Sequence, residues 1–153
     1  MPEESKYYLI YVSYARHKMA DDDLLKLLEE CRSNNEGNGI TGMLLYIDKK
    51  FIQVIEGDKQ TVVDLFDRIS LDRRHKKVSI ILEGELKTRN FQGWAMAFEA
   101  EDKKKVREFS AYRDFETIFG AHSLVNQNHP AFTFLKLFYE KNYKNSSVSA
   151  QAS

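Results

Sequence analysis

The sequence predicts an α+β fold, namely a ferredoxin-like βαββαββ sandwich with a C-terminal helical cap. Five short segments are rich in β-branched and aromatic residues, which is typical of strands. Two segments between them carry apolar residues at helical spacing. At 153 residues the chain has the size of one domain, so we expect these elements to share a single core.

The first strand and the first helix are predicted within residues 7–32. Residues 7–14 (YYLIYVSY) are almost continuously hydrophobic, which predicts a central strand covered on both faces. Residues 20–32 open with helix-capping aspartates and place apolar side chains at helical spacing, namely Leu24, Leu27, Leu28 and Cys31. We expect SNNEGNG at 33–39 to end the helix, because Asn and Gly favour helix ends and turns.

A hairpin, a second helix and two more strands complete the predicted sheet. Residues 40–47 and 51–57 are two β-rich runs joined by the short polar turn DKK, which predicts a hairpin. The second helix covers 58–72, with Asp58 as its N-cap. Its apolar face consists of Val62, Leu65, Phe66 and Ile69. The last two strands are expected at 77–86 and 93–100.

Two helices cover only one face of such a sheet, so the other face needs a cap. We expect the sheet domain to span 1–101, the cap 102–143 and a disordered tail 144–153, where apolar residues are scarce. Pro130 suits the first turn of a cap helix. That helix has a stripe of Phe134, Leu135, Phe138 and Tyr139, widened by Phe132 and Leu137. The width predicts contact with the sheet on one side and with a partner or second subunit on the other, and hence a homo-oligomer.

Composition excludes several classes of function. The 23 basic and 23 acidic residues give a formal net charge of zero, which disfavours nucleic-acid and membrane-surface binding. Cys31 is the single cysteine, so no internal disulfide can form. The chain starts without the features of a signal peptide and has no apolar run of roughly 20 residues. We therefore expect a soluble, cytoplasmic protein.

Sequence motifs of common enzymes and metal sites are missing. There is no GxGxxG, P-loop, HExxH, CxxC or GxSxG pattern. The four histidines lack metal-ligand spacing and are explained by surface or packing roles. We expect neither catalytic turnover nor a metal ion.

Polar residues at inward strand positions are the strongest functional signal. Period-two alternation places Tyr11 with Leu9 on one face, and Gln53 with Phe51 and Ile55. Because the two strands are expected to be neighbours, the phenol and the amide could meet. A lone inward tyrosine is usually a core residue, but a buried amide without partners costs about 1–3 kcal/mol. Gln53 therefore needs a partner.

The other polar candidates have structural as well as functional interpretations. Asn34 and Asn35 suit a helix C-cap, or could present donors and acceptors to the edge of a heterocycle. Arg68, Asp72 and His75 follow at i, i+4 and i+7 on one helical face, as in an exposed salt-bridged helix end or a grip on a ribityl chain or phosphate.

Five blocks, taken together in order and spacing, resemble the BLUF family, sensors of blue light using FAD. They are LIYVS with Tyr11, NNEGNGITGMLLY, FIQVIEG with Gln53, DRISLDRRH, and NFQGWAM with Trp94 and Met96. The resemblance covers about residues 6–100, and the co-occurrence of the blocks makes it highly specific. Residues 102–143 more loosely resemble the helical cap of short, stand-alone BLUF proteins, and we expect no effector domain in the remaining chain.

The resemblance implies noncovalent FAD, with its isoalloxazine ring between the two helices and against the sheet. Tyr11 would then be the photochemical electron donor and Gln53 the amide between it and the flavin. Asn35 would hydrogen-bond the polar edge of the ring, and Asn34 would lie beside it. The segment that approaches the ribityl and phosphate side would be Arg68, Asp72, Arg74 and His75. Trp94 and Met96, which singly suggest only a core strand, would relay the signal.

The resemblance also implies a photoreceptor that signals through light-dependent binding to an unidentified protein partner. Two other functions compete with this one. An acylphosphatase-like hydrolase would use Arg16 as a phosphate clamp, but its loop YARHKMADDD lacks a glycine-rich cradle. A flavin-free interaction module would make Gln53 structural and leave function to the C-terminal helix.

Overall fold

The structure, a computed structural model, describes residues 6–91, 97–100 and 128–152. Residues 21, 97–100 and 143–152 are described by their backbone alone. Trp94 and Met96, expected to relay the signal, lie outside the described residues, as does most of the predicted cap before Pro130.

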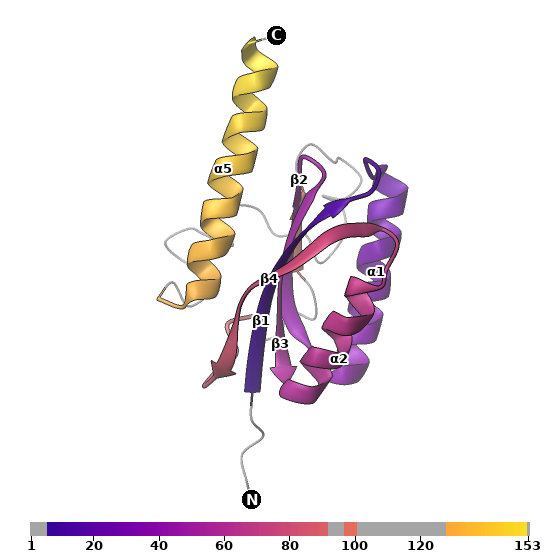
Figure 1. Cartoon of the computed structure of the whole chain (residues 1–153), viewed down its shortest axis with the longest axis vertical. Coiled ribbons are helices and arrows are strands. Elements are labelled where there is room, and N and C mark those ends of the chain that lie inside the picture. Colours follow the sequence, from indigo (N-terminus) through magenta and orange to yellow (C-terminus); the bar gives the residue numbers. More distant parts are fainter. Residues whose placement is uncertain (1–5, 92–96, 101–127, 153) are drawn as a thin grey trace, which may run out of the picture.

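A five-stranded sheet with the order β4-β1-β3-β2-β5 forms the centre of the fold (Figure 1). Its strands are β1 (Lys6–Ala15), β2 (Thr41–Ile47), β3 (Lys50–Asp58), β4 (His75–Leu86) and β5 (Ala97–Ala100). The pairs β4–β1, β1–β3 and β3–β2 are antiparallel, whereas β5 runs parallel to β2. This arrangement confirms the predicted ferredoxin-like α+β fold with one extra strand, in which β1 has neighbours on both sides.

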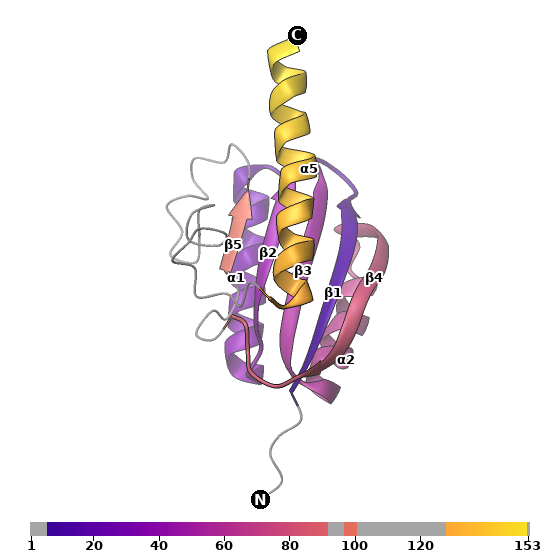
Figure 2. The same cartoon turned by 90° about the vertical axis from the view of Figure 1, so that its left-hand side faces the viewer.

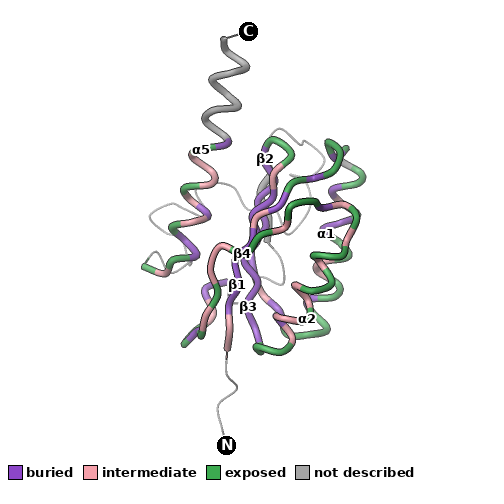
Figure 3. The backbone as a smooth tube through the Cα atoms, viewed as in Figure 1, coloured by how far each residue is buried: buried purple, intermediate pink, exposed green. Residues whose placement is uncertain are grey.

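Helices cover both faces of the sheet. Helices α1 (Asp21–Asn38) and α2 (Lys59–Ser70) lie on one face, and α5 (Pro130–Ala152) lies on the other (Figures 1 and 2). Two buried clusters follow from this layering. The residues of β1 and β3 alternate between them: Leu9, Tyr11, Phe51 and Ile55 face α1 and α2, whereas Tyr8, Ile10, Ile52 and Val54 face α5. Figure 3 shows β1 and β3 largely buried, whereas β4 and the outer sides of α1 and α2 are largely exposed or half-buried.

Local sequence explains the tight connections around β3. Asp48 and Lys49 both have positive φ, 52° and 63°, as a two-residue type I′ hairpin turn requires. The turn is therefore one residue shorter than the predicted DKK, because Lys50 already pairs with Ile47. Asp58 is the N-cap of α2, as predicted, and its carboxylate accepts a hydrogen bond from the Thr61 backbone N–H at 3.3 Å.

Both helix ends near the expected site differ from prediction. Helix α1 does not end at residues 33–35 but continues through Asn38, and Gly39 caps it with a left-handed φ of 67°. The C-cap interpretation of Asn34 and Asn35 is therefore wrong. Helix α2 ends at Ser70, where the predicted helix ran to residue 72, so Arg68, Asp72 and His75 do not share one helical face.

The C-terminal helix caps the sheet face opposite α1 and α2. Ala131, Phe132 and Leu135 are buried against that face, with Phe134 and Phe138 half-buried beside them. Leu137 is 56% exposed and points away from the core. Helix α5 continues through Ala152 and extends beyond the sheet, where a tail over 144–153 was expected (Figure 2).

Candidate functional site

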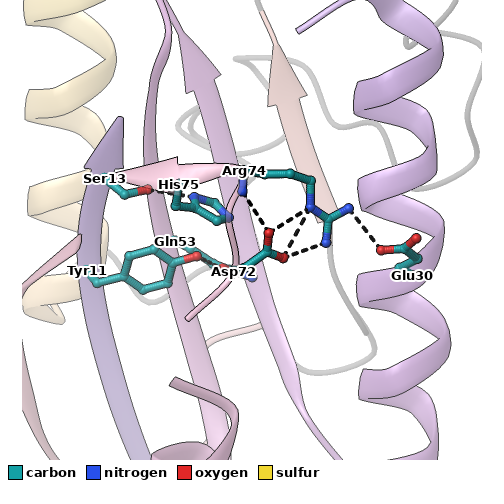
Figure 4. A network of polar contacts seen from close by, with 7 residues as sticks. All are labelled: Tyr11, Ser13, Glu30, Gln53, Asp72, Arg74 and His75. Atoms are coloured by element: carbon teal, nitrogen blue, oxygen red, sulfur yellow. Dashed lines mark hydrogen bonds and ion pairs between the residues drawn. The ribbon is translucent and has the colours of Figure 1, made fainter. Parts of the chain in front are cut away.

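A hydrogen-bonded phenol and amide lie at the centre of the candidate site. Tyr11 and Gln53 are directly opposite each other in the β1–β3 pairing, and the Tyr11 hydroxyl donates to Gln53 Oε1 (Figure 4). Only 1% of Tyr11 and 2% of Gln53 is exposed. This confirms the prediction that the two side chains meet. Burial raises the pKa of the Tyr11 phenol, so it carries its proton at neutral pH.

A pocket opens above this pair between α1 and α2. Its cavity has a volume of about 120 Å³ and is open to solvent at its mouth. All eight predicted cofactor-binding residues line it: Tyr11, Asn34, Asn35, Gln53, Arg68, Asp72, Arg74 and His75. Sequence reasoning missed its other walls, which are Leu27, Glu30, Cys31, Leu44, Leu65 and Ile69. The helical spacing of Leu27, Cys31, Leu65 and Ile69 was a signal for these walls, but it was interpreted only as core.

The two asparagines occupy the last turns of α1. Asn35 is 2% exposed, while Asn34 is exposed at the pocket rim. The Asn35 backbone carbonyl accepts hydrogen bonds from the N–H groups of Gly39 and Ile40. Because the backbone ties this turn to the start of β2, the Asn35 side chain is held in the pocket wall.

An ionic network closes the pocket between the end of α2 and helix α1 (Figure 4). The Arg74 guanidinium donates from Nη2 to Asp72 Oδ2 at 2.6 Å and from Nη1 to Glu30 Oε2 at 2.9 Å. Asp72 Oδ1 also accepts from the Arg74 backbone N–H at 2.9 Å, which stabilises a turn in place of further helix. These hydrogen bonds from Arg74 lower the pKa of Asp72.

His75, at the start of β4, lies on the sheet beside the pair. Its Nδ1 is 2.9 Å from Ser13 Oγ, and its ring packs against Phe51 at 4.8 Å between centroids. Burial lowers the pKa of His75, so the ring is neutral near pH 7. Sequence reasoning missed Ser13, although it follows Tyr11 by two residues on the same strand face.

Other kinds of site find little support in the residues that the structure describes. No group of three or more His, Cys, Asp or Glu side chains among them could hold a metal ion. Within the same residues, no helix has both the length and the apolar character needed to cross a membrane. Arg16, the predicted phosphate clamp of the hydrolase alternative, does not line this pocket but lines a neighbouring one, and the two share Glu30, Asp72 and Arg74.

The residues of the pocket fit a flavin. Apolar walls from α1, α2 and β2 suit a flat aromatic ring, and Asn35 and Gln53 offer amide donors and acceptors at its inner end. Arg68 is exposed at the rim, where a cation suits a phosphate-bearing chain. Fold and site together define a ferredoxin-like ligand-binding domain with a buried phenol–amide pair below its ligand pocket.

The chain belongs to the BLUF family, described as sensors of blue light using FAD. The family profile matches residues 7–97, and FAD is the cofactor by which the family is defined. This match supports the photoreceptor interpretation and neither of the two alternatives.

Relatives and solved structures agree with this assignment. The alpha subunit of photoactivated adenylate cyclase from Euglena gracilis is 43% identical over 70 residues, 46% of this chain and 7% of the relative. Its beta subunit is 33% identical over 95 residues, 61% of this chain and 11% of the relative. The chain thus spans only a small part of these cyclases.

Two solved structures are similar over most of their length. BlrB, a BLUF protein in its dark state, has a TM-score of 0.61 at 30% identity, covering 70% of this chain and 80% of that one. BlsA in its ground state has a TM-score of 0.62 at 28% identity, covering 90% and 87%.

Proposed function

We propose that this chain is a blue-light sensor that binds FAD noncovalently between α1 and α2 and switches through Tyr11 and Gln53. The observation that carries the proposal is their buried hydrogen bond at the inner end of the pocket. Family membership supplies the cofactor and the stimulus. The remaining question is how these particular side chains respond.

FAD, when bound, absorbs blue light, and its excited ring can accept an electron. A phenol such as Tyr11 can give up an electron and then a proton, which phenylalanine cannot do. Gln53 Oε1 already accepts the hydrogen bond of that phenol, so it stands where the proton leaves. An amide has a donor end and an acceptor end, and turning or tautomerising it exchanges them while the backbone stays in place. Gln53 therefore acts as a reversible switch.

The surrounding residues would hold the cofactor and orient the pair. Asn35 would hydrogen-bond the polar edge of the ring, with Asn34 beside it at the rim. Arg68 and Arg74 would face the ribityl and phosphate side, where Asp72 keeps Arg74 oriented through three contacts with its side chain. Neutral His75, held by Ser13, would complete the floor.

The output would be light-dependent binding to a protein partner, as the cap helix and the family suggest. One rearranged hydrogen bond is worth about 0.5–1.5 kcal/mol. This changes a balanced equilibrium about tenfold and cannot force an unfavourable one. A nearly balanced element, such as helix α5 or the segment that precedes β5, would suit this energy. We expect a homo-oligomer that presents α5 to its partner.

An absorption spectrum before and after blue illumination tests the proposal. The purified protein should be yellow, and its flavin bands should shift reversibly to the red. Tyr11→Phe and Gln53→Leu should each retain flavin and lose the shift. A colourless protein, or normal photocycling in either variant, would contradict the assignment.

A further inference from the structure

A buried carboxylate at the end of β3 holds the chain that leads into residues 92–96. Glu56 is 0% exposed and, like Ile52 and Val54, belongs to the sheet face that α5 covers. Its Oε1 accepts from the Phe91 backbone N–H at 2.7 Å, and its Oε2 accepts from the Asn90 backbone N–H at 3.0 Å. The two amides bind it as backbone N–H groups bind an anion.

Two further side chains complete what we call the Glu56 clamp, which consists of Thr41, Glu56, Arg89, Asn90 and Phe91. Thr41 donates from Oγ1 to Glu56 Oε1 at 2.8 Å. Arg89 donates from Nη1 to Thr41 Oγ1 at 3.1 Å and lies 3.4 Å from the Glu56 carbonyl oxygen. The clamp therefore joins the start of β2, the end of β3 and the connection after β4.

The pairing of β2 with β3 does not need a charge at this position. Their register is already set along seven paired residues, and an apolar side chain would fit a buried face without desolvating a carboxylate. The carboxylate instead fixes the position of residues 89–91 through its hydrogen bonds. Phe91 is 1% exposed and belongs to the buried cluster that contains Phe132 and Leu135 of α5. The position of the Phe91 backbone therefore affects the packing of the cap helix.

The clamp also contains a side-chain hydrogen-bond donor without an acceptor among the described residues. Asn90 is 6% exposed, and its side-chain Nδ2 has no hydrogen-bond partner in the described structure. A buried donor without a partner disfavours the present arrangement relative to one that pairs it. Any rearrangement of residues 89–91 that gives this donor a partner would be favoured to that extent.

We propose that Glu56 is a positioning residue that couples strand β3, which carries Gln53, to residues 89–91 and to α5. This inference rests on the proposed function, because Gln53 is taken as the switch. Glu56 lies three residues from Gln53 on the same strand and faces the opposite side of the sheet. A shift of β3 at the flavin would reach the backbone of Asn90 and Phe91 through one hydrogen bond to each.

Amide hydrogen exchange of the FAD-loaded protein, measured in the dark and under blue light, tests the coupling. In the wild-type protein the Asn90 and Phe91 amides should be protected in the dark, and light should speed exchange there and in α5. Glu56→Gln should retain FAD and the red shift. In this variant the backbone N–H groups of Asn90 and Phe91 should exchange about tenfold to a hundredfold faster in the dark. The Gln side chain has one acceptor oxygen, whereas the carboxylate offers one oxygen to each of the two N–H groups. The light-dependent change in α5 should be lost in this variant.

Thr41→Val is the matched control, since it removes the hydroxyl that donates to Glu56 Oε1 and accepts from Arg89 Nη1 but leaves both backbone hydrogen bonds to Glu56. It should keep the light response of α5. If Glu56→Gln does not fold, Glu56→Asp keeps the charge, shortens the reach by one methylene and should show a weaker form of the same loss. A normal red shift with an unchanged light response of α5 in the Glu56 variants would overturn the coupling alone. A wild-type protein without any red shift would overturn the proposed function as well.

Discussion

Replacing Tyr11 and Gln53, singly and together, gives the sharpest test of the pair at the centre of the pocket. Tyr11→Phe removes the hydroxyl and takes one donor from a buried amide. Gln53→Leu leaves a buried phenol without its acceptor. Both side chains are almost fully buried, so each single change leaves a buried polar group without the partner it has now. Each single change should destabilise the fold by about 1–3 kcal/mol.

The double variant should be less destabilised than the two single changes predict together. In the double variant both polar groups are replaced, so neither a buried hydroxyl nor a buried amide is left without the other. An apolar pair of similar shape remains. We expect the double variant to be about 1–3 kcal/mol more stable than the sum of the single effects implies.

Urea unfolding of all four proteins, followed by circular dichroism at one fixed FAD concentration, measures this coupling. The concentration of FAD must be constant because ligand binding shifts apparent stability. Additivity within about 0.5 kcal/mol would show that the phenol and the amide do not depend on each other, and would refute the reasoning. Gln53→Ala is the control for volume, since it adds a cavity that Gln53→Leu avoids.

Three further predictions concern the frame of the pocket. Gly57→Ala should lower stability by about 1–3 kcal/mol in urea unfolding, because its Cβ would lie 3.1 Å from a backbone carbonyl oxygen just after α1. Gly37→Ala, with nothing within 4 Å, should instead stabilise α1 by about 0.5–1 kcal/mol, and equal effects at both glycines would contradict the packing argument. Asp58→Ala should cost about 1 kcal/mol through the lost N-cap of α2, whereas Asp58→Asn, which can still cap, should cost little. Asp72→Asn should destabilise the protein at pH 7, since the contacts with Arg74 lower the folded-state pKa of Asp72 below its unfolded value of about 3.9. That stability is present above the unfolded pKa and is lost as pH falls through the folded pKa, so the two proteins should converge in acid; a constant gap would argue against the ion pair.

Local pattern in the sequence was enough to predict the fold and the central pair. Strand and helix periodicity gave the element order, and period-two alternation put Tyr11 and Gln53 on inward positions of neighbouring strands. Family resemblance then supplied eight candidate residues, all of which line one cavity. The element order and the inward positions were predictable because each depends on the spacing of residues within one element.

Helix ends were harder to predict, because the competing local signals differ by little free energy. Asn34 and Asn35 are common at C-caps, yet α1 continues past them to Gly39, which adopts a left-handed φ without the steric penalty of a side chain. Similarly, the contacts between Asp72 and Arg74 favour a turn where helical spacing alone predicted more helix.

By itself, the sequence determined which residue types face the core and the pocket, since alternation and helical spacing decide the side on which each side chain lies. Only the tertiary structure decided which side chains meet across elements. Strand register placed Tyr11 directly opposite Gln53, and burial on the other sheet face set Glu56 against the backbone of Asn90 and Phe91. Such contacts depend on residues 34 or more positions apart, and no local pattern records the hydrogen bonds that a buried carboxylate or amide must find.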